Sequence, residues 1–380
     1  MKRVALITDG IYPYVIGGMQ KHSFNLVNYF TLNGVEVDLY HSVPGNGSVS
    51  ESSLFSDEQK RLIHEIRVPW PGTGLMPGHY LRESYRYSIT VFENYMKRPP
   101  VDFTYIKGFS GWKLLEEKKQ GRVGGIMGVN FHGYEMFQPS IGLRSKLSAI
   151  LFRGAVRYNI SAADYVFSYG ANITSIIEGL GISRSRIIEI PTGIERGWLE
   201  KDKVSTHEKR RFIFVGRNER RKGIRELMHA VKMLDKAGPF TLDMVGPVGP
   251  KRIKNVIYHG EIREERELRK LLGECDVLVC PSHSEGMPNV IMEAMACGLA
   301  VIGTDVGAVP VMVDEKNGIL LKPGKARDLA AAMEKFIYMP MPELNEMKRS
   351  SLNKVASCFL WEYIIAETIK KLDVVITQNG

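Results

Sequence analysis

The feature that most constrains the fold of this chain is an alternation of short apolar runs with amphipathic stretches. The first run, VALIT, is followed by a glycine-rich loop, a helical pattern and a second apolar run, VEVDLY. The helical pattern places Leu26, Val27 and Phe30 on one face, and it ends before Gly34. Successive strands that are joined through a helix run parallel, so this stretch predicts a βαβ unit within a parallel sheet.

The same alternation starts again after the middle of the chain. RFIFVG predicts a strand, and a polar loop and a helical pattern follow it, with Ile224, Leu227, Met228 and Val231 on one face. The later strands are predicted at FTLDMVG, NVIYHG, DVLVCPS, LAVIGTD and GILLKPG. Two strand-first starts within 380 residues predict two doubly wound α/β domains facing each other across a cleft. Their boundary is expected in the polar stretch 193–209.

Composition and charge narrow the class of protein. The four cysteines have no metal-ligand spacing, and no apolar run approaches the roughly 20 residues that cross a bilayer. The N-terminal apolar run is interrupted by Asp9 and does not resemble a signal peptide. A cytoplasmic location is therefore expected. The net charge of +9 favours anionic partners without choosing among phosphates, nucleic acid and acidic lipid.

The segment PSHSEGMPNVIMEAMACGLAVIGTDVG carries two glutamates in otherwise small and apolar surroundings. Glu285 falls in the loop after a predicted strand, and Glu293 falls inside a helix whose first turn is expected at Pro288 and whose end is expected at Gly298. Eight residues of helical rise correspond to about 12 Å. The two carboxylates are therefore predicted to hold the two ends of an extended ligand, with free backbone N–H groups between them that favour an anion.

This segment closely resembles the signature of family-four glycosyltransferases, which are nucleotide-sugar-dependent retaining enzymes of the GT-B fold. Enzymes of that fold have two Rossmann-like domains around a cleft. The resemblance implies that Glu285 faces the hydroxyls of the donor sugar and that Glu293 holds the nucleotide ribose. It extends over nearly the whole chain.

Further motifs carry the same resemblance. In FVGRNERRKG it implies that Arg217 and Lys222 clamp the diphosphate, whose negative charge grows as the glycosidic bond breaks. In GGMQKH it implies close backbone approach at Gly17 and Gly18, and in NFHGYE it places His132 near the donor sugar. VGPVG and YHGEI stand where the family reads the base through main-chain groups.

The resemblance thus implies a complete set of site residues and a division of the chain. The catalytic residues are His132, Glu285, Arg217 and Lys222. The donor-binding residues are Gly17, Gly18, Gly216, Arg217, Lys222, Gly246, Gly260, Ile262, Glu285, Gly286, Met287, Asn289, Val290 and Glu293. CFLWEYIIAETIKKL resembles the family's returning terminal helix, so we expect an acceptor-side domain at 1–195, a donor-binding domain at 196–357 and this helix at 358–380. The chain departs from the family's pattern at Gln20, Thr192, Ala308 and Val311.

The expected reaction is the transfer of a sugar, with retention, from a nucleotide diphosphate donor to a glycan or lipid-linked acceptor in cell-surface polysaccharide or glycolipid synthesis. No Asp-x-Asp occurs and the histidines do not cluster, so we expect no metal and no cofactor. The alternatives are a sugar-nucleotide epimerase of the same fold and a non-catalytic protein that binds polyanions. A phosphorylase would need a lysine site for a pyridoxal group, which is not found. The basic residues are dispersed and no nucleic-acid module is present, so no nucleic-acid partner is expected.

One stretch suggests a membrane surface. Residues 136–163 contain no acidic side chain. If LRSKLSAILFRGAVRYN is helical, Lys146, Arg153 and Arg157 fall within about 40° of one another. They flank an apolar face made of Leu143, Leu147, Ile150 and Leu151. A basic stripe beside an apolar stripe is typical of a helix that lies on an anionic membrane. The alternative is a core-facing helix with a solvated basic edge, and Gly154 in mid-helix weakens the membrane pattern.

Overall fold

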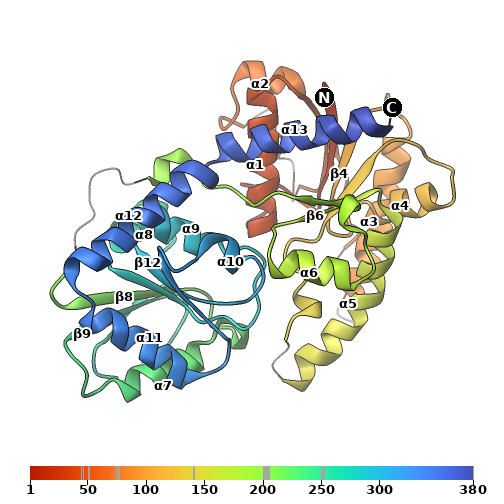
Figure 1. The fold of residues 1–380 in the computed structure, drawn as a ribbon. Helices are drawn as coiled ribbons and strands as arrows, with labels where there is room; N and C mark the ends of the chain where they lie inside the picture. The colour runs from red at the N-terminus through yellow and green to blue at the C-terminus, as the bar shows by residue number, and fades with distance from the viewer. Residues whose placement is uncertain are drawn as a thin grey trace.

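The computed structural model contains two α/β units that lie side by side (Figure 1), each built on a wholly parallel sheet. It describes residues 1–43, 45, 47–49, 52–72, 74, 78–139, 142–199, 206–249 and 253–379. The predicted fold class, two doubly wound domains, is confirmed. Within this part of the chain, no helix is both long enough and apolar enough to cross a membrane.

The first sheet has seven strands in the order β3-β2-β1-β4-β5-β6-β7. Their bounds are β1 Arg3–Ile7, β2 Glu36–His41, β3 Ile63–Arg67, β4 Phe103–Lys107, β5 Met127–Asn130, β6 Tyr165–Ser168 and β7 Ile187–Glu189. The helices of this unit are α1 Gly18–Leu32, α2 Asp57–Leu62, α3 His79–Tyr95, α4 Trp112–Lys119, α5 Leu143–Ala162 and α6 Asn172–Gly179. The strand order reverses between β1 and β4, which is where ligands of such sheets bind.

The second sheet has six strands in the order β10-β9-β8-β11-β12-β13. Their bounds are β8 Arg210–Val215, β9 Phe240–Val245, β10 Val256–Gly260, β11 Val277–Cys280, β12 Ala300–Thr304 and β13 Gly318–Leu321. The helices are α7 Ile224–Met233, α8 Glu265–Gly273, α9 Asn289–Ala296, α10 Val309–Met312, α11 Ala326–Tyr338 and α12 Met341–Cys358. Here the order reverses between β8 and β11, the strands that precede the two predicted charged loops.

Burial on both faces explains why the strands read as continuous apolar runs. Val4, Leu6 and Ile7 in β1 are fully buried, as are Phe212 and Ile213 in β8. Strands of parallel sheets that are covered by helices on both sides lack the polar–apolar alternation of half-exposed strands. The sequence pattern therefore located these strands even without a period of two.

The last helix, α13 (Trp361–Asn379), lies across the first unit and packs against α1 (Figure 1). The indole of Trp361 is buried and stacks on Tyr29 with ring centroids 5.8 Å apart. The backbone N–H of Ile194 donates to the Phe359 carbonyl at 2.7 Å, and that of Trp361 donates to the Ile194 carbonyl at 3.1 Å. The chain passes from one unit to the other near Ile194 and returns near Phe359, and these two segments are hydrogen-bonded to each other.

One expectation about the glutamate-bearing segment is shifted by a residue. Pro288 has extended backbone angles, φ −72° and ψ 115°, and forms the N-cap of α9, so the first helical turn begins at Asn289. Gly298 follows the helix with φ 76°, a left-handed conformation that glycine adopts without strain. Glu285 lies in the preceding loop and Glu293 within the helix, as predicted.

Candidate active site in the interdomain cleft

The carboxyl ends of the central strands of both sheets meet at the Glu285 loop. The side-chain amide of Gln138 in the first domain donates to the Glu285 carbonyl at 2.6 Å and accepts from the Glu285 N–H at 3.2 Å. A Cβ on Gly286 would lie 3.0 Å from the Cα of Gly133, so a side chain at this position would crowd the other domain. The loop that carries Glu285 is therefore held directly by the first domain.

The Glu285 carboxylate is buried and fully paired. Lys222 Nζ lies 2.6 Å from its Oε1, and the Ser282 hydroxyl donates to the same oxygen at 2.7 Å. Arg221 NH1 lies 3.4 Å from Oε2. Two cations of the loop after β8 thus face one carboxylate of the loop after β11, where an anionic ligand would compete for the cations.

Glycine 223 sets the position of this basic loop. It follows the 3₁₀ turn Arg220–Lys222 and has a φ of 72°. A Cβ on Gly223 would lie 1.9 Å from the Pro281 carbonyl oxygen, so no other residue fits without moving the backbone. The close approach presses the loop against the end of β11 and brings Lys222 to Glu285.

The structure brings together only some of the predicted cations. The Arg217 side chain is 72% exposed and pairs with Glu219 at 3.0 Å rather than with Glu285. Arg221, which also pairs with Glu219 at 2.7 Å, reaches Glu285 in its place. Sequence analysis missed Arg221, although it directly precedes Lys222 in RNERRKG and was one of three arginines in that motif.

His132 is held in a strained position at the end of β5. Its φ is 60°, its backbone N–H donates to Asn130 Oδ1 at 2.7 Å, and its ring Nδ1 is hydrogen-bonded to the Tyr169 hydroxyl. Burial, assisted by the nearby Lys107 charge, holds the pKa of His132 well below its ordinary value. Among the residues that the structure describes, none is hydrogen-bonded to the buried Nε2. When Tyr169 donates to Nδ1, the neutral ring offers an Nε2–H donor.

A buried polar layer that the sequence did not reveal lies beneath the glycine-rich loop. Lys107, at the end of β4, is fully buried, and its Nζ lies 2.7 Å from His22 Nδ1. Burial holds the pKa of Lys107 well below its ordinary value, and the Asp9 charge opposes this shift. Gln20 Nε2 donates to Asp9 Oδ1 at 2.9 Å. This contact explains the departure at Gln20, because an acidic residue would face the Asp9 carboxylate there.

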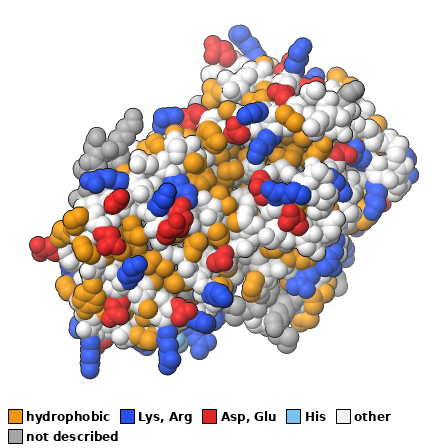
Figure 2. Space-filling model, in the orientation of Figure 1, with side chains coloured by type: hydrophobic (Ala, Val, Ile, Leu, Met, Phe, Trp, Pro, Cys, Tyr) orange, Lys and Arg blue, Asp and Glu red, His pale blue; other side chains and the backbone are white. Residues whose placement is uncertain are grey.

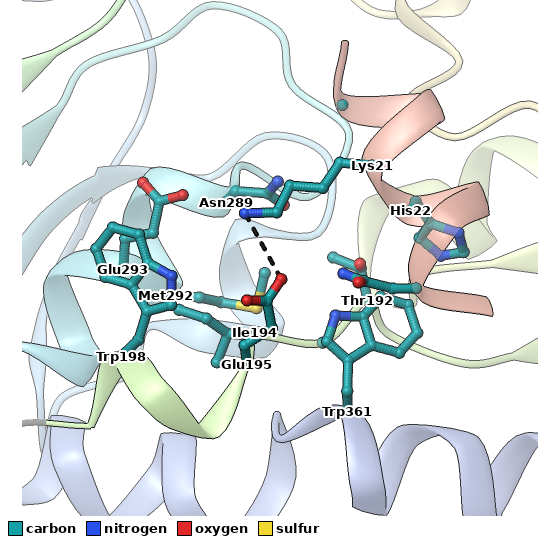
Figure 3. Close-up of a pocket in the computed structure, with 13 residues that line it drawn as sticks. Lys21, His22, Thr192, Ile194, Glu195, Trp198, Asn289, Met292, Glu293 and Trp361 are labelled. Atoms are coloured by element: carbon teal, nitrogen blue, oxygen red, sulfur yellow. Dashed lines mark ion pairs between the residues drawn. The ribbon is translucent and has the colours of Figure 1, made fainter. Parts of the chain in front are cut away.

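Glu293 lines a separate pocket, together with Asn289 and Met292 of α9. The first residues of α1, the linker after β7, α9 and the start of α13 enclose this pocket (Figure 3). Burial raises the pKa of Glu293 to about 7, the Lys21 charge lowers it, and Glu265 and Glu195 raise it further. We call this space the Glu293 pocket. Thr192, another departure from the family's pattern, lines it as well.

Some of the remaining predicted residues lie near the two glutamates. Asn289 and Gly18 line the Glu293 pocket. Met287, which lies between Glu285 and Glu293 in the sequence, is buried. Gly17 has extended backbone, and a Cβ there would lie 2.3 Å from Gln20 Oε1. The half-buried members of this remaining set are Gly17, Gly216, Gly260, Ile262, Gly286 and Val290.

The glycines at the ends of β8, β9 and β10 form one bonded edge. Gly246 has a φ of 130°, and a Cβ there would lie 2.0 Å from the Gly216 carbonyl oxygen. Its N–H donates to the Gly260 carbonyl at 2.7 Å. The two departures near β12 make different contacts. Ala308 N–H donates to the Gly286 carbonyl at 2.8 Å within the second domain. A Cβ on Gly170 of the first domain would lie 3.1 Å from Val311 of the second.

A second cleft opens beside the Glu285 loop and is lined by residues of both domains. Its first-domain wall is largely apolar, and its second-domain wall is polar. The lining residues include Met136, Pro139, Ala149, Phe152, Arg221 and Ser284. Arg221 and Ser284 tie this cleft to the Glu285 loop, because the Arg221 guanidinium also lies 3.3 Å from the Ser284 carbonyl.

The outer face of α5 adjoins that cleft and is apolar. Leu147, Ile150 and Leu151 are 58%, 59% and 54% exposed, so they do not face the core. The guanidinium groups of Arg153 and Arg157 lie over the Phe137 ring at 5.8 and 5.6 Å. The side chains of Leu143 and Lys146, which complete the predicted pattern, lie outside the described residues. We call Leu147, Ile150 and Leu151 the α5 patch.

Comparison with known proteins connects the C-terminal domain to one family. Residues 209–338 match the family described as glycosyl transferases group 1. Over 130 residues the chain is 35% identical to TuaC of Bacillus subtilis (strain 168), a protein named for teichuronic acid biosynthesis; the match covers 34% of this chain and 33% of TuaC. It is 25% identical over 241 residues, 62% of this chain and 63% of the relative, to a Campylobacter jejuni N-acetylgalactosaminyltransferase named for a diphospho-undecaprenol substrate. The chain spans from a third to about half of the length of the first three curated relatives.

Solved structures share the architecture of the whole chain. Sucrose-phosphate synthase from Thermosynechococcus elongatus superposes with a TM-score of 0.78 over all of both chains, at 19% identity. WaaG, a glycosyltransferase involved in lipopolysaccharide biosynthesis, superposes with a TM-score of 0.64 over 98% of this chain and 99% of its own, at 15% identity. At such identities the likeness is one of fold.

Proposed function

Because this chain belongs to the family-four glycosyltransferases of the GT-B fold, we propose that it moves a sugar from a nucleotide diphosphate donor to a glycan or lipid-linked acceptor with retention of configuration. The observation that carries the proposal is the buried Lys222–Glu285 contact of 2.6 Å at the meeting point of the two sheets. It places a cation, which suits a diphosphate, beside a carboxylate, which suits the hydroxyls of a sugar.

Each residue has a role that follows from its surroundings. Lys222 and Arg221 hold oxygens of the diphosphate, and Glu285 accepts hydrogen bonds from hydroxyls of the donor sugar. His132, kept neutral by burial, donates from Nε2 to the same sugar. Glu293, beyond the first turn of α9, accepts from the ribose, and the N–H groups at the start of α9 face the diphosphate between them.

The bond changes can proceed on one face of the sugar. The bond from the anomeric carbon to the diphosphate oxygen breaks, and the acceptor oxygen bonds to that carbon from the same side. The acceptor proton passes to the leaving phosphate. Lys222 and Arg221 stabilise the charge that collects on this phosphate, and such preorganised charges contribute most when water is excluded. Glu285 is bonded to Lys222 and Ser282, which favours a binding role over attack on the sugar.

We propose a metal-independent reaction, because side-chain cations and helix N–H groups supply the positive charge. Within the described residues no cluster of His, Cys, Asp or Glu has the arrangement of a metal site. The polyanion-binding alternative is less favoured. On the face drawn in Figure 2, Lys and Arg side chains are interspersed with acidic ones and form no continuous basic surface.

The acceptor is proposed to enter through the apolar-walled cleft beside Glu285, and the α5 patch is proposed to rest on an anionic membrane at its cytoplasmic face. Each basic residue near such a surface contributes about 1 kcal/mol. Replacing Lys146, Arg153 and Arg157 by Glu should abolish binding to anionic liposomes and leave nucleotide binding intact. A triple replacement of exposed cations on α11 and its N-terminus, Lys325, Arg327 and Lys335, is the matched control. A wild-type protein that ignores such liposomes at low salt would contradict the membrane proposal and favour a soluble acceptor.

The reaction itself is tested with a panel of uridine, guanosine, adenosine and thymidine diphosphate sugars, read by release of the nucleoside diphosphate. We expect release from one or two donors and loss of release in Glu285→Gln. Appearance of an epimerised sugar nucleotide instead would establish the epimerase alternative. Binding of generic DNA with no turnover of any donor would establish the polyanion-binding alternative.

A further inference from the structure

One lysine of the first domain contacts carboxylates from two other parts of the chain. Lys21 extends from α1 into the Glu293 pocket, where its Nζ lies 3.7 Å from Glu195 in the linker (Figure 3). The same Nζ lies 3.3 Å from Glu265 at the start of α8 in the second domain. Only 34% of the Lys21 side chain is exposed. A single ammonium group therefore contacts the linker and the second domain at the wall of this pocket.

Glu293 lines the same pocket as this lysine. The Lys21 charge stabilises its ionised form, whereas burial and the charges of Glu265 and Glu195 oppose ionisation. The helix α12 also packs on α9, but its Lys348 ammonium is engaged 3.2 Å from Asp276. Besides Glu293, the charged and titratable groups that line the pocket are Lys21, His22 and Glu195, and Glu265 of α8 contacts Lys21. The linker also carries Arg196, and α8 also carries Arg269.

Those other groups do not replace Lys21. Burial, with the Lys107 charge, holds the pKa of His22 well below its ordinary value, so its ring is neutral. The Arg269 guanidinium is bonded to the Gly197 carbonyl. Arg196 pairs with Glu362 of α13 at 3.2 Å. Of these cations, Lys21 is the one whose charge lowers the pKa of the Glu293 carboxyl.

We propose that Lys21 is a positioning residue of the donor site, through which the first domain sets how strongly Glu293 of the second domain holds the ribose of the donor. The inference rests on the proposed function, in which Glu293 contacts that ribose. An ionised carboxylate accepts a hydrogen bond from each of two neighbouring hydroxyls, while a protonated one must use part of its capacity as a donor. Lys21 acts by keeping Glu293 in the accepting form.

The direction of the pH dependence follows from the charges. Burial raises the pKa of Glu293 to about 7, so the carboxylate form is lost, and ribose binding weakens, as the pH falls through that value. Removing Lys21 raises the pKa further and moves the loss of binding to higher pH. Removing the Glu265 charge lowers the pKa and moves the loss to lower pH. The two substitutions are therefore expected to act in opposite directions.

The test measures dissociation constants of uridine, guanosine, adenosine and thymidine diphosphate by calorimetry from about pH 5.5 to about pH 9, a range that spans the titration. The proteins are wild type, Lys21→Met, Lys21→Arg, Glu265→Gln and Glu293→Gln. Lys21→Met should bind about fivefold more weakly at pH 7, as expected if the pKa rises by about one unit, with its binding midpoint at higher pH. Lys21→Arg should restore the wild-type profile, and Glu265→Gln should move the midpoint to lower pH.

The outcomes separate this inference from the function on which it rests. Unchanged midpoints in Lys21→Met, or shifts in the same direction in Lys21→Met and Glu265→Gln, would overturn the role of Lys21. If Glu293→Gln binds as tightly as wild type, or if wild type binds none of the four nucleotides, the donor-site assignment fails first. Thermal unfolding of each variant serves as the folding control, because a purely structural role would change stability without moving the pH midpoint.

Discussion

Replacing Lys222 by alanine tests the centre of the proposed site. Lys222 Nζ lies 2.6 Å from a buried carboxylate, and its own side chain is only 16% exposed. If the ammonium also holds the donor diphosphate, its loss removes a charge that the transition state needs more than the ground state does. We therefore expect the substitution to lower kcat more than it weakens donor binding.

The structure allows the two effects of this substitution to be compared. Removing one preorganised stabiliser typically lowers kcat by roughly 10²- to 10³-fold, about 2.7 to 4 kcal/mol. Breaking a buried pair usually costs about 3 to 5 kcal/mol of stability, because a charge is left without a partner. Glu285 retains the Ser282 hydroxyl at 2.7 Å and Arg221 at 3.4 Å, so the loss of stability should be well below that range.

The assay is nucleotide release at saturating donor and acceptor, with urea unfolding of the same preparations. Arg217→Ala is the matched control for stability, because the Arg217 side chain is 72% exposed and contributes little to packing. If Arg217 closes on the diphosphate as the family resemblance implies, this variant should lose turnover with a change in unfolding free energy of less than about 0.5 kcal/mol. If it does not, Arg221 is the second cation of the site.

Near-normal turnover of a folded Lys222→Ala protein would refute the assignment. A loss of turnover that is matched by global unfolding would not support it either, and in that case Lys222→Arg decides. An arginine retains the charge, so it should restore folding and part of the turnover if charge on the leaving group is what matters.

Three further predictions concern the domain contact, the buried lysine and the chemistry. Gln138→Leu removes both hydrogen bonds to the Glu285 backbone. It should lower kcat/KM by about 10-fold or more, because small displacements of the reacting groups slow the reaction. Unchanged kinetics would show that the Glu285 loop keeps its position without Gln138. The Lys107→Met protein should gain stability relative to wild type as the pH falls. Burial lowers the pKa of Lys107 in the folded state, so protonation of this lysine at low pH favours unfolding. A difference in unfolding free energy between the two proteins that stays constant across pH, measured by urea titration, would contradict this. Activity should persist in EDTA and the product should retain the anomeric configuration by NMR; inversion, or a loss that magnesium reverses, would exclude the proposed route.

Local sequence predicted the parts of the site that depend on nearby residues. The apolar runs located the parallel strands because helices cover both faces of each sheet. The carboxyl ends of those strands then indicated where the loops that bind ligand begin. Glu285 and Glu293 were placed correctly, in a loop and a helix, because strand, turn and helix signals surround them at short range.

Contacts between distant segments were decided by the tertiary structure alone. Gln138 lies 147 positions from the loop that it holds, and neither segment carries a local signal for the other. Arg217 and Arg221 belong to one polar motif, and sequence alone does not tell them apart. The folded loop, with Gly223 against Pro281, brings Arg221 rather than Arg217 to Glu285. Lys107 ends an apolar strand, and its burial beside His22 follows from the packing of α1 over the sheet.

The sequence by itself determined the two-domain parallel architecture and the identity of the residues that end its central strands. Both depend on burial and backbone geometry, which apolar runs, helical periodicity and glycine or proline positions indicate within a few residues. It did not determine how the two domains meet. Lys21 and Glu265 are 244 positions apart, in two domains between which the chain passes in the linker and again before α13. Their contact, and with it the charge that surrounds Glu293, exists only because closure of the cleft brings the ends of both sheets together.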